Sequence, residues 1–199
     1  MEKKFLSLLV CVSFFGSKTW AAMTPVSIGI FPPIQFPSED VTVVGLRANI
    51  LWGFHRNVYG FDLGLGINQT SQTISGLAQI AGIANLNKGQ NTILGAQIGG
   101  IGNFNTNPTR VIGVQFAGIT NNNQGDSMFV GLQISPVNLS SNSRVVGAQI
   151  GLFNTARKVI GFQIGLVNRA ESVTGLQIGL MNFHRLGLFA ACPIINFGF

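Results

Sequence analysis

One ten-residue pattern occurs twice between residues 159 and 182, fourteen residues apart, and the rest of the chain repeats it. It reads Val-x-Gly-x-Gln-x-Gly-x-Val/Met-Asn. In the first copy Gly161 and Gly165 lie two residues either side of Gln163, and the intervening positions are all apolar: Ile160, Phe162, Ile164 and Leu166. An alternation of period two is typical of a β-strand with two chemically different faces. Each copy is therefore predicted to be one strand with an apolar face and a Gly/Gln face.

Copies of the pattern run through most of the chain. The first, residues 41 to 50, has Arg47 at the central position, and the second, residues 57 to 68, has Asp62 there. All later copies have glutamine: Gln79, Gln97, Gln115, Gln133, Gln149, Gln163 and Gln177. The intervals between these glutamines are 18, 18, 18, 16, 14 and 14 residues. The variation falls in connectors rich in Asn, Gly and Ser, which are turn residues.

Asparagine recurs where each strand is expected to end, at Asn68, Asn85, Asn103, Asn121, Asn138, Asn154, Asn168 and Asn182. Its side chain can bond the backbone of its own turn and tolerates left-handed conformations. Turn chemistry is the preferred interpretation of this recurrence. The alternative is a stacked asparagine ladder inside a solenoid.

The pattern is nearly palindromic, so antiparallel neighbours would still place small residues against small ones and glutamine near glutamine. The apolar face of one copy covers about 25 Å, close to the apolar band of a transmembrane barrel. The preferred fold is therefore an all-β, antiparallel, up-and-down transmembrane β-barrel of about ten strands from residue 41 onward, or alternatively twelve. Its function would be structural, with a narrow porin-like channel as one form.

The rival fold is a β-solenoid with one coil per fourteen to eighteen residues, which would put the Ile/Leu/Phe face inside and stack the asparagines. Such a chain would be a non-enzymatic, surface-exposed binding or adhesion module. Two observations favour it: the connectors do not alternate short and long, and aromatic residues for a membrane belt are few apart from phenylalanine.

The ends of the chain indicate export. Residues 1 to 22 contain Lys3 and Lys4, then the apolar run FLSLLVCVSFF, then small residues up to Ala22, which predicts a secretory signal peptide. Residues 23 to 40 form a proline-rich lead-in or closing segment, and residues 41 to 199 form the repeat domain. The two end segments share a Pro-Ile motif and are expected to meet where the sheet closes. A terminal Phe199 resembles the signal by which outer-membrane barrels are recognised for assembly.

Only 9% of the residues are charged, compared with about 25% in soluble domains, which argues against an ordinary water-facing surface. The basic residues are spread singly over the connectors without aromatic stacking partners, so nucleic-acid binding is not expected. His55 and His184 are interpreted as solvated turn residues without metal-ligand spacing. No catalytic residues, metal site or cofactor are predicted.

The one candidate constellation is an inward polar belt of the barrel, made of the central residues of all nine copies: Arg47, Asp62, Gln79, Gln97, Gln115, Gln133, Gln149, Gln163 and Gln177. In an antiparallel hairpin turning at residues 54 and 55, Arg47 would lie opposite Asp62. The belt would either line a narrow aqueous passage or close the lumen by hydrogen bonding.

Residues 42 to 182, with the opening FPPIQFP and the ending PIINFGF, resemble a family of uncharacterised exported bacterial proteins built from GLQIGLxN surface repeats. This resemblance implies a surface or outer-membrane location and supplies no known activity. The barrel interpretation, in turn, predicts outer-membrane lipid and the barrel-assembly machinery as partners, with a host or surface ligand left open. The chain departs from the pattern at Leu77 and at Ser135-Pro136, and the strand with Pro136 is expected to be bent or at an edge.

Overall fold

The computed structural model describes residues 22–199, which form strands and turns only. The strands are β1 (Met23–Phe31), β2 (Ile34–Phe36), β3 (Thr42–Asn49), β4 (Trp52–Gly64), β5 (Ile67–Ala81), β6 (Ala84–Asn87), β7 (Gln90–Gly99), β8 (Gly102–Asn105), β9 (Thr109–Ala117), β10 (Thr120–Asn123), β11 (Met128–Ile134), β12 (Val137–Ile150), β13 (Phe153–Ile164), β14 (Val167–His184) and β15 (Ala191–Gly198). The predicted signal peptide lies, except for its last residue, outside the described residues.

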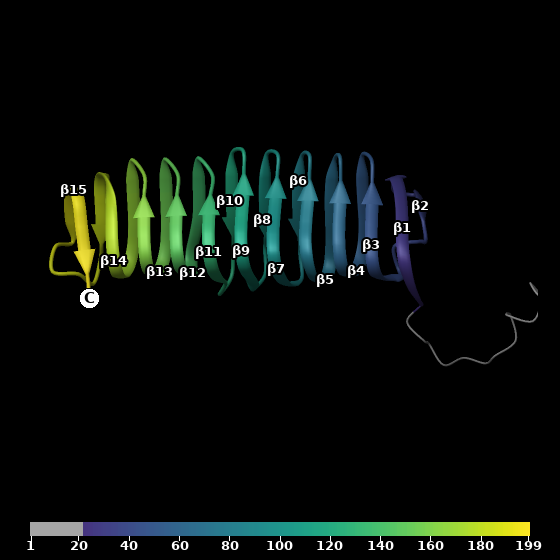
Figure 1. The fold of residues 1–199 in the computed structure, drawn as a ribbon, viewed down its shortest axis with the longest axis horizontal. Helices are drawn as coiled ribbons and strands as arrows, with labels where there is room; N and C mark the ends of the chain where they lie inside the picture. The colour runs from purple at the N-terminus through teal and green to yellow at the C-terminus, as the bar shows by residue number, and fades with distance from the viewer. Residues whose placement is uncertain (1–21) are drawn as a thin grey trace, which may run out of the picture.

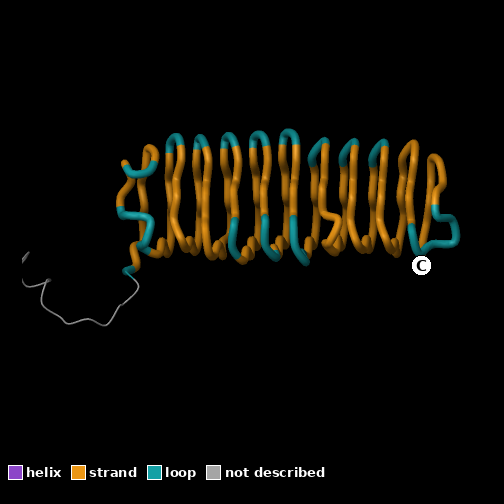
Figure 2. The backbone as a smooth tube through the Cα atoms, turned by 180° about the vertical axis from the view of Figure 1, so that it is seen from behind, coloured by secondary structure: helices purple, strands orange, loops and turns teal. Residues whose placement is uncertain are grey.

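The chain winds into a β-solenoid of about nine turns (Figure 1). Each coil contributes one strand segment to a long sheet, which carries the Val-x-Gly-x-Gln pattern, and one to a short sheet, which carries the recurrent asparagine. A two-residue upper turn, such as 165–166, leads from the long sheet to the short one. A lower turn of variable length leads back, and in several coils the strand continues through it (Figure 2).

The prediction of an antiparallel transmembrane barrel of ten or twelve strands is wrong. Consecutive coils pair in parallel and in register, so that Gly161 lies beside Gly175 and Gln163 beside Gln177. The palindromic pattern is compatible with antiparallel pairing but does not require it, because parallel stacking also brings each residue against its equivalent. The end segments do not meet either: β1 and β15 lie at opposite ends of the solenoid (Figure 1).

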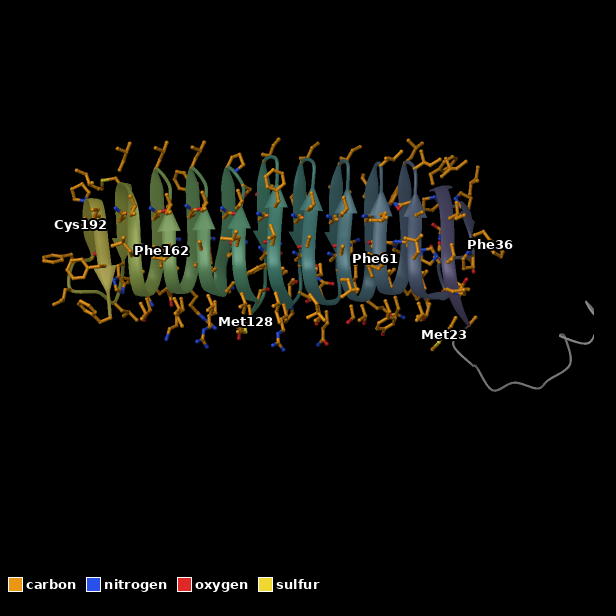
Figure 3. All side chains as sticks on the ribbon, in the orientation of Figure 1. Met23, Phe36, Phe61, Met128, Phe162 and Cys192 are labelled. Carbon is orange, nitrogen blue, oxygen red and sulfur yellow. The ribbon has the colours of Figure 1, made fainter. Side chains whose placement is uncertain are left out.

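The solenoid alternative has the correct coil length, but its assignment of the faces is wrong. Glutamine and asparagine point into the space between the two sheets, where the seven repeat glutamines are fully buried. Isoleucine, leucine and phenylalanine point outward, and Phe61 and Phe162 are 44% and 51% exposed on the long sheet (Figure 3). An apolar column next to the lower turns is the exception: Val43, Val58, Ile74, Ile93, Val111, Phe129, Val145, Val159 and Val173 are buried.

The first glycine of the pattern forms a column along the long sheet, where consecutive coils approach closely. Gly161 has a φ of 125°, a conformation that side-chain-bearing residues rarely adopt. A Cβ atom there would lie 2.1 Å from the carbonyl oxygen of Gly147 in the preceding coil. Glycine is therefore required by both the backbone conformation and the spacing between coils.

The two departures from the repeat pattern are absorbed locally. Gly76 pairs with Gly60, and Ala78 pairs with Phe61, so Leu77 is an extra residue that bulges outward. Pro136 lies in the upper turn between β11 and β12, and Val137 donates to the Ile119 carbonyl in its place. The expectation of a bent or edge strand at Pro136 is therefore wrong, because the proline needs no ladder partner in this turn.

Both ends of the solenoid are covered by antiparallel strands. At the N-terminal end β1 stacks in parallel on β3 and carries the antiparallel β2. The side chain of Gln35 in β2 then pairs with the backbone of Phe54, donating to its carbonyl at 2.7 Å and accepting from its N–H at 3.2 Å. At the C-terminal end β15 reverses direction and pairs with β14. These caps end the parallel stacking, which open edges would otherwise allow to continue.

Candidate functional site

The residues of the predicted polar belt lie together in one row inside the solenoid. Each glutamine side chain donates to the glutamine of the preceding coil, as Gln163 does to Gln149 and Gln177 does to Gln163, both at 2.7 Å. In the wider coils the second N–H crosses to the short sheet, where Gln97 donates to the Asn105 side chain at 3.1 Å. Amide groups stacked in register satisfy one another in this way in parallel β-structures.

Arg47 and Asp62 form the N-terminal end of this ladder. Every amide of the ladder donates toward the N-terminus. The first residue of the ladder therefore has to accept a bond from Gln79, and a carboxylate can do so without needing an acceptor in the coil before it. The Asp62 carboxylate accepts from Gln79 at 3.0 Å and from Arg47 in a bidentate pair with both distances 2.7 Å. Both side chains are almost fully buried. The predicted contact is therefore present, but between parallel strands of consecutive coils and not across an antiparallel hairpin.

The recurrent asparagines form a second ladder on the short sheet, which contradicts their interpretation as turn residues. Asn154 donates to the Asn168 side chain at 2.9 Å and to the Ile164 carbonyl at 2.8 Å, so both of its N–H groups are bonded. Each asparagine donates toward the C-terminus, whereas each glutamine donates toward the N-terminus. The dipoles of the two ladders therefore oppose each other across the interior.

This interior has no room for a channel. The glutamine ladder bonds to other short-sheet side chains such as Asn87 and Asn105, and the asparagine ladder bonds to backbone carbonyls. The apolar column occupies the space beside the lower turns. A narrow porin-like passage along the belt is therefore not supported. Buried polar groups are normally hydrogen-bonded, and these amides meet that condition through their neighbours in adjacent coils. The exceptions are at the ends of the rows, where Asn49 Oδ1 and Gln177 Oε1 have no partner among residues 22–199.

The two histidines are buried, not solvated as predicted. They occupy equivalent inward positions of the first and last coils, His55 on the short sheet beside the Arg47–Asp62 pair and His184 beside Val173, whose N–H it accepts at 3.0 Å. Burial and, second, the nearby Arg47 charge lower the pKa of His55 to about 4. Burial also lowers the pKa of His184.

The lowered pKa of His55 predicts a pH-dependent stability at the N-terminal end. The unfolded chain binds a proton at His55 below pH 6.5, whereas the folded chain binds it only near pH 4, so stability is lost as the pH falls through this window. A shift of this size corresponds to a loss of up to about 3 kcal/mol. Denaturation of wild type and His55→Thr between pH 7 and 4 measures it, since threonine occupies this position in the next coil. Equal pH dependence of the two proteins would contradict the assignment.

The exposed charged residues gather along the lower turns, here called the charged edge. Eight are basic and four acidic, and three surface ion pairs join Arg56 to Asp40, Arg157 to Asp126 and Arg185 to Glu171. Five basic side chains have no ionic partner among residues 22–199: Lys88, Arg110, Arg144, Lys158 and Arg169. Arg144 and Lys158 are neighbours in consecutive coils, so this edge concentrates positive charge.

A polar hollow of about 260 Å³ lies on the charged edge. Arg169, Glu171 and Arg185 line it together with Ser141 and Thr155. No group of three or more His, Cys, Asp or Glu side chains within the described part of the chain could hold a metal ion. The hollow offers charge and hydrogen bonding to a ligand.

Sequence reasoning missed the charged edge as a surface because it took the connectors for independent loops. The changing intervals between glutamines were the signal for it. In the structure the upper turns keep one length while the lower turns differ between coils. Apart from the bulge at Leu77, the insertions therefore fall on the same side of the molecule. The described residues contain no helix long and apolar enough to cross a membrane.

No protein-family model matches the chain, and the searches of curated proteins and of solved structures gave no match either. The resemblance to the surface-repeat family therefore stays a prediction based on its motifs.

Proposed function

We propose that this protein is a non-enzymatic β-solenoid module displayed at the bacterial cell surface, which binds anionic partners through its charged edge. The observation that carries the proposal is the confinement of the coil-length variation, apart from the single-residue bulge at Leu77, to the lower turns. In repeat proteins, insertions often map to the binding face, because the stacked core constrains the rest of each coil.

The charges on this edge support an anionic partner. The free basic side chains of Arg110, Arg144 and Lys158 follow one another along the lower rim of the long sheet, with Met128 between the two arginines. Surface ion pairs contribute little to stability, so the paired residues nearby are not needed to hold the fold together. A row of unpaired cations on a rigid scaffold instead favours association with a negatively charged surface.

The surface location rests on the predicted signal peptide and on the surface-repeat motifs. Expression of the full chain with an epitope tag inserted after Gly125, in a lower turn, tests it. Antibody is expected to bind the tag on intact cells, and to require permeabilised cells when residues 2–22 are deleted. A tag that stays inaccessible on intact cells in both forms would contradict surface display.

Retention on immobilised heparin, used as a polyanion probe, tests the charged edge itself. The variant R110Q/R144Q/K158Q is expected to bind at least about tenfold more weakly, since each basic residue near an anionic surface contributes roughly 1 kcal/mol. The matched control R157Q/D126N removes an ion pair from the same edge without changing the net charge. Equal losses in both variants would show that the free cations do not form the binding surface.

A further inference from the structure

We infer that the solenoid inserts edge-on into one leaflet of a lipid bilayer, with its upper turns toward the bilayer centre and its charged edge among the headgroups. The inference rests on the proposed surface location and adds the partner that covers the apolar surface. The molecule is inverted relative to a soluble domain, because amides fill its interior and large apolar side chains cover its exterior. Such an exterior marks a site of contact with a membrane or another protein.

Polarity changes in one direction across the height of the molecule. The row along the upper turns, here called the apolar edge, consists of exposed apolar side chains without a charge: Leu51, Leu65, Ile83, Ile101, Ile119, Leu152, Leu166 and Leu180. On the opposite edge many side chains end in nitrogen and oxygen atoms, with apolar ones such as Met128 between them (Figure 3). Three charged residues start away from that edge. Arg47 and Asp62 are buried, and Arg169 points outward from the short sheet into the polar hollow that Glu171 and Arg185 also line. A partner that is apolar at one depth and polar at another matches this gradient.

The height of the solenoid also matches one leaflet. A long-sheet segment of seven residues spans about 23 Å. Half of a bilayer, including its headgroups, measures about 20–22 Å, of which about 15 Å is hydrocarbon. With the apolar edge near the bilayer centre, the lower turns would therefore reach the headgroup level. The free Arg110, Arg144 and Lys158 would lie where anionic lipid phosphates are.

The backbone N–H groups at the apolar edge are hydrogen-bonded, as an environment without water requires. Hydrocarbon tolerates irregular backbone only where its polar groups are hydrogen-bonded. The upper-turn N–H groups donate from coil to coil, as Ile119 does to the Ile101 carbonyl at 2.9 Å and Leu166 does to the Leu152 carbonyl at 2.9 Å. In the coil between those of Ile119 and Leu152, the equivalent upper-turn residue is Pro136, which has no N–H to satisfy.

The ends of the solenoid and a hollow near the apolar edge have the same apolar character. Phe36 is 79% exposed on the N-terminal cap, and Phe199 is 98% exposed on the C-terminal one. A shallow hollow of about 520 Å³, lined largely by apolar groups, lies beside the Pro136 turn, with Phe116, Ile134 and Ile150 among its lining residues. An acyl chain has the shape and chemistry to fill it.

A second copy of the chain would cover less of this surface. Two long sheets packed face to face would bury their outward rows but would leave the apolar edge and both caps in water. Lipid can contact the long sheet, the apolar edge and the caps together. The distribution of apolar residues therefore favours a bilayer over a dimer.

Environment-sensitive labels test the depth and the orientation. The full chain, with Cys11 and Cys192 replaced by serine, is synthesised cell-free with phosphatidylcholine vesicles containing 30% phosphatidylglycerol. A nitrobenzoxadiazole label is attached at Leu166→Cys on the apolar edge or at Ser141→Cys on the charged edge. The label at 166 is expected to show a blue-shifted emission and protection from dithionite, and the label at 141 to remain accessible. Two accessible labels on floating vesicles would overturn edge-on insertion.

Vesicle flotation of variants separates lipid binding from self-association. L152N/L166N/L180N is expected to float roughly tenfold less than wild type or worse, since three exposed leucines no longer enter hydrocarbon, with circular dichroism checking the fold. R110Q/R144Q/K158Q is expected to lose the preference for phosphatidylglycerol over pure phosphatidylcholine. A chain that stays with neither vesicle and forms dimers by light scattering would overturn the inference in favour of a second copy. Surface display on cells would be unaffected by that result, so the two proposals fail separately.

Discussion

Replacing Arg47 by glutamine is expected to destabilise the first coils of the solenoid by about 3–5 kcal/mol, because it leaves the Asp62 carboxylate buried without a counter-charge. Replacing Asp62 by glutamine should have a comparable effect, since the guanidinium group then loses both bidentate contacts. The double variant R47Q/D62Q should recover most of the loss. Two glutamines would extend the ladder that begins at Gln79, with each side chain donating to the coil before it.

Urea denaturation of the four proteins in a mild detergent, followed by circular dichroism, measures these differences as a double-mutant cycle. Hydrogen exchange of the β3 and β4 amides locates the change, because in a repeat protein each coil depends mainly on its neighbours. The exchange in β13 and β14 serves as the internal control and is expected to stay the same. Additive losses in the double variant would contradict a role of the pair as the end of the ladder.

The long-sheet segments were predictable, because the period-two alternation around each glutamine is local, whereas the short-sheet segments were taken for turns. The proximity of Arg47 and Asp62 was predictable for the same reason: both occupy the central position of neighbouring copies. The direction of pairing was not, because a nearly palindromic strand places equivalent residues together in either orientation. The burial of His55 was not predictable either. Nothing around it in the sequence distinguishes a solvated turn from the inward side of a short strand.

The choice of the inner face was the hardest part to predict, because the usual rule places apolar residues inside. Two features of the sequence override that rule here. Stacked amides such as Gln149 and Gln163 bond each other at 2.7 Å, which removes the cost of burying them. The Gly147 and Gly161 column brings successive coils too close for any larger residue at that position. Apolar residues between these positions are then left on the outside by the alternation of the strand.

A pair of adjacent substitutions in the central coil tests this inversion directly. Gln133→Leu should cost about 4 kcal/mol, because it removes the bonds to the side chains of Gln115 and Ser140 and leaves the Gln149 amide without an acceptor. Leu132→Gln, one residue away on the exposed side, should change the free energy of unfolding by less than about 1 kcal/mol. Urea denaturation in detergent compares the two variants with wild type.

The position of Gln133 makes its loss more damaging than the single-residue cost suggests. Coils on both sides are coupled only through their shared interfaces, so a break in the middle of the ladder should divide unfolding into two transitions instead of one. Leu132→Gln should keep a single transition. If Leu132→Gln were the more destabilising change, leucine would lie in the packed interior and glutamine outside, and the amide core together with the apolar exterior on which bilayer insertion rests would both be wrong.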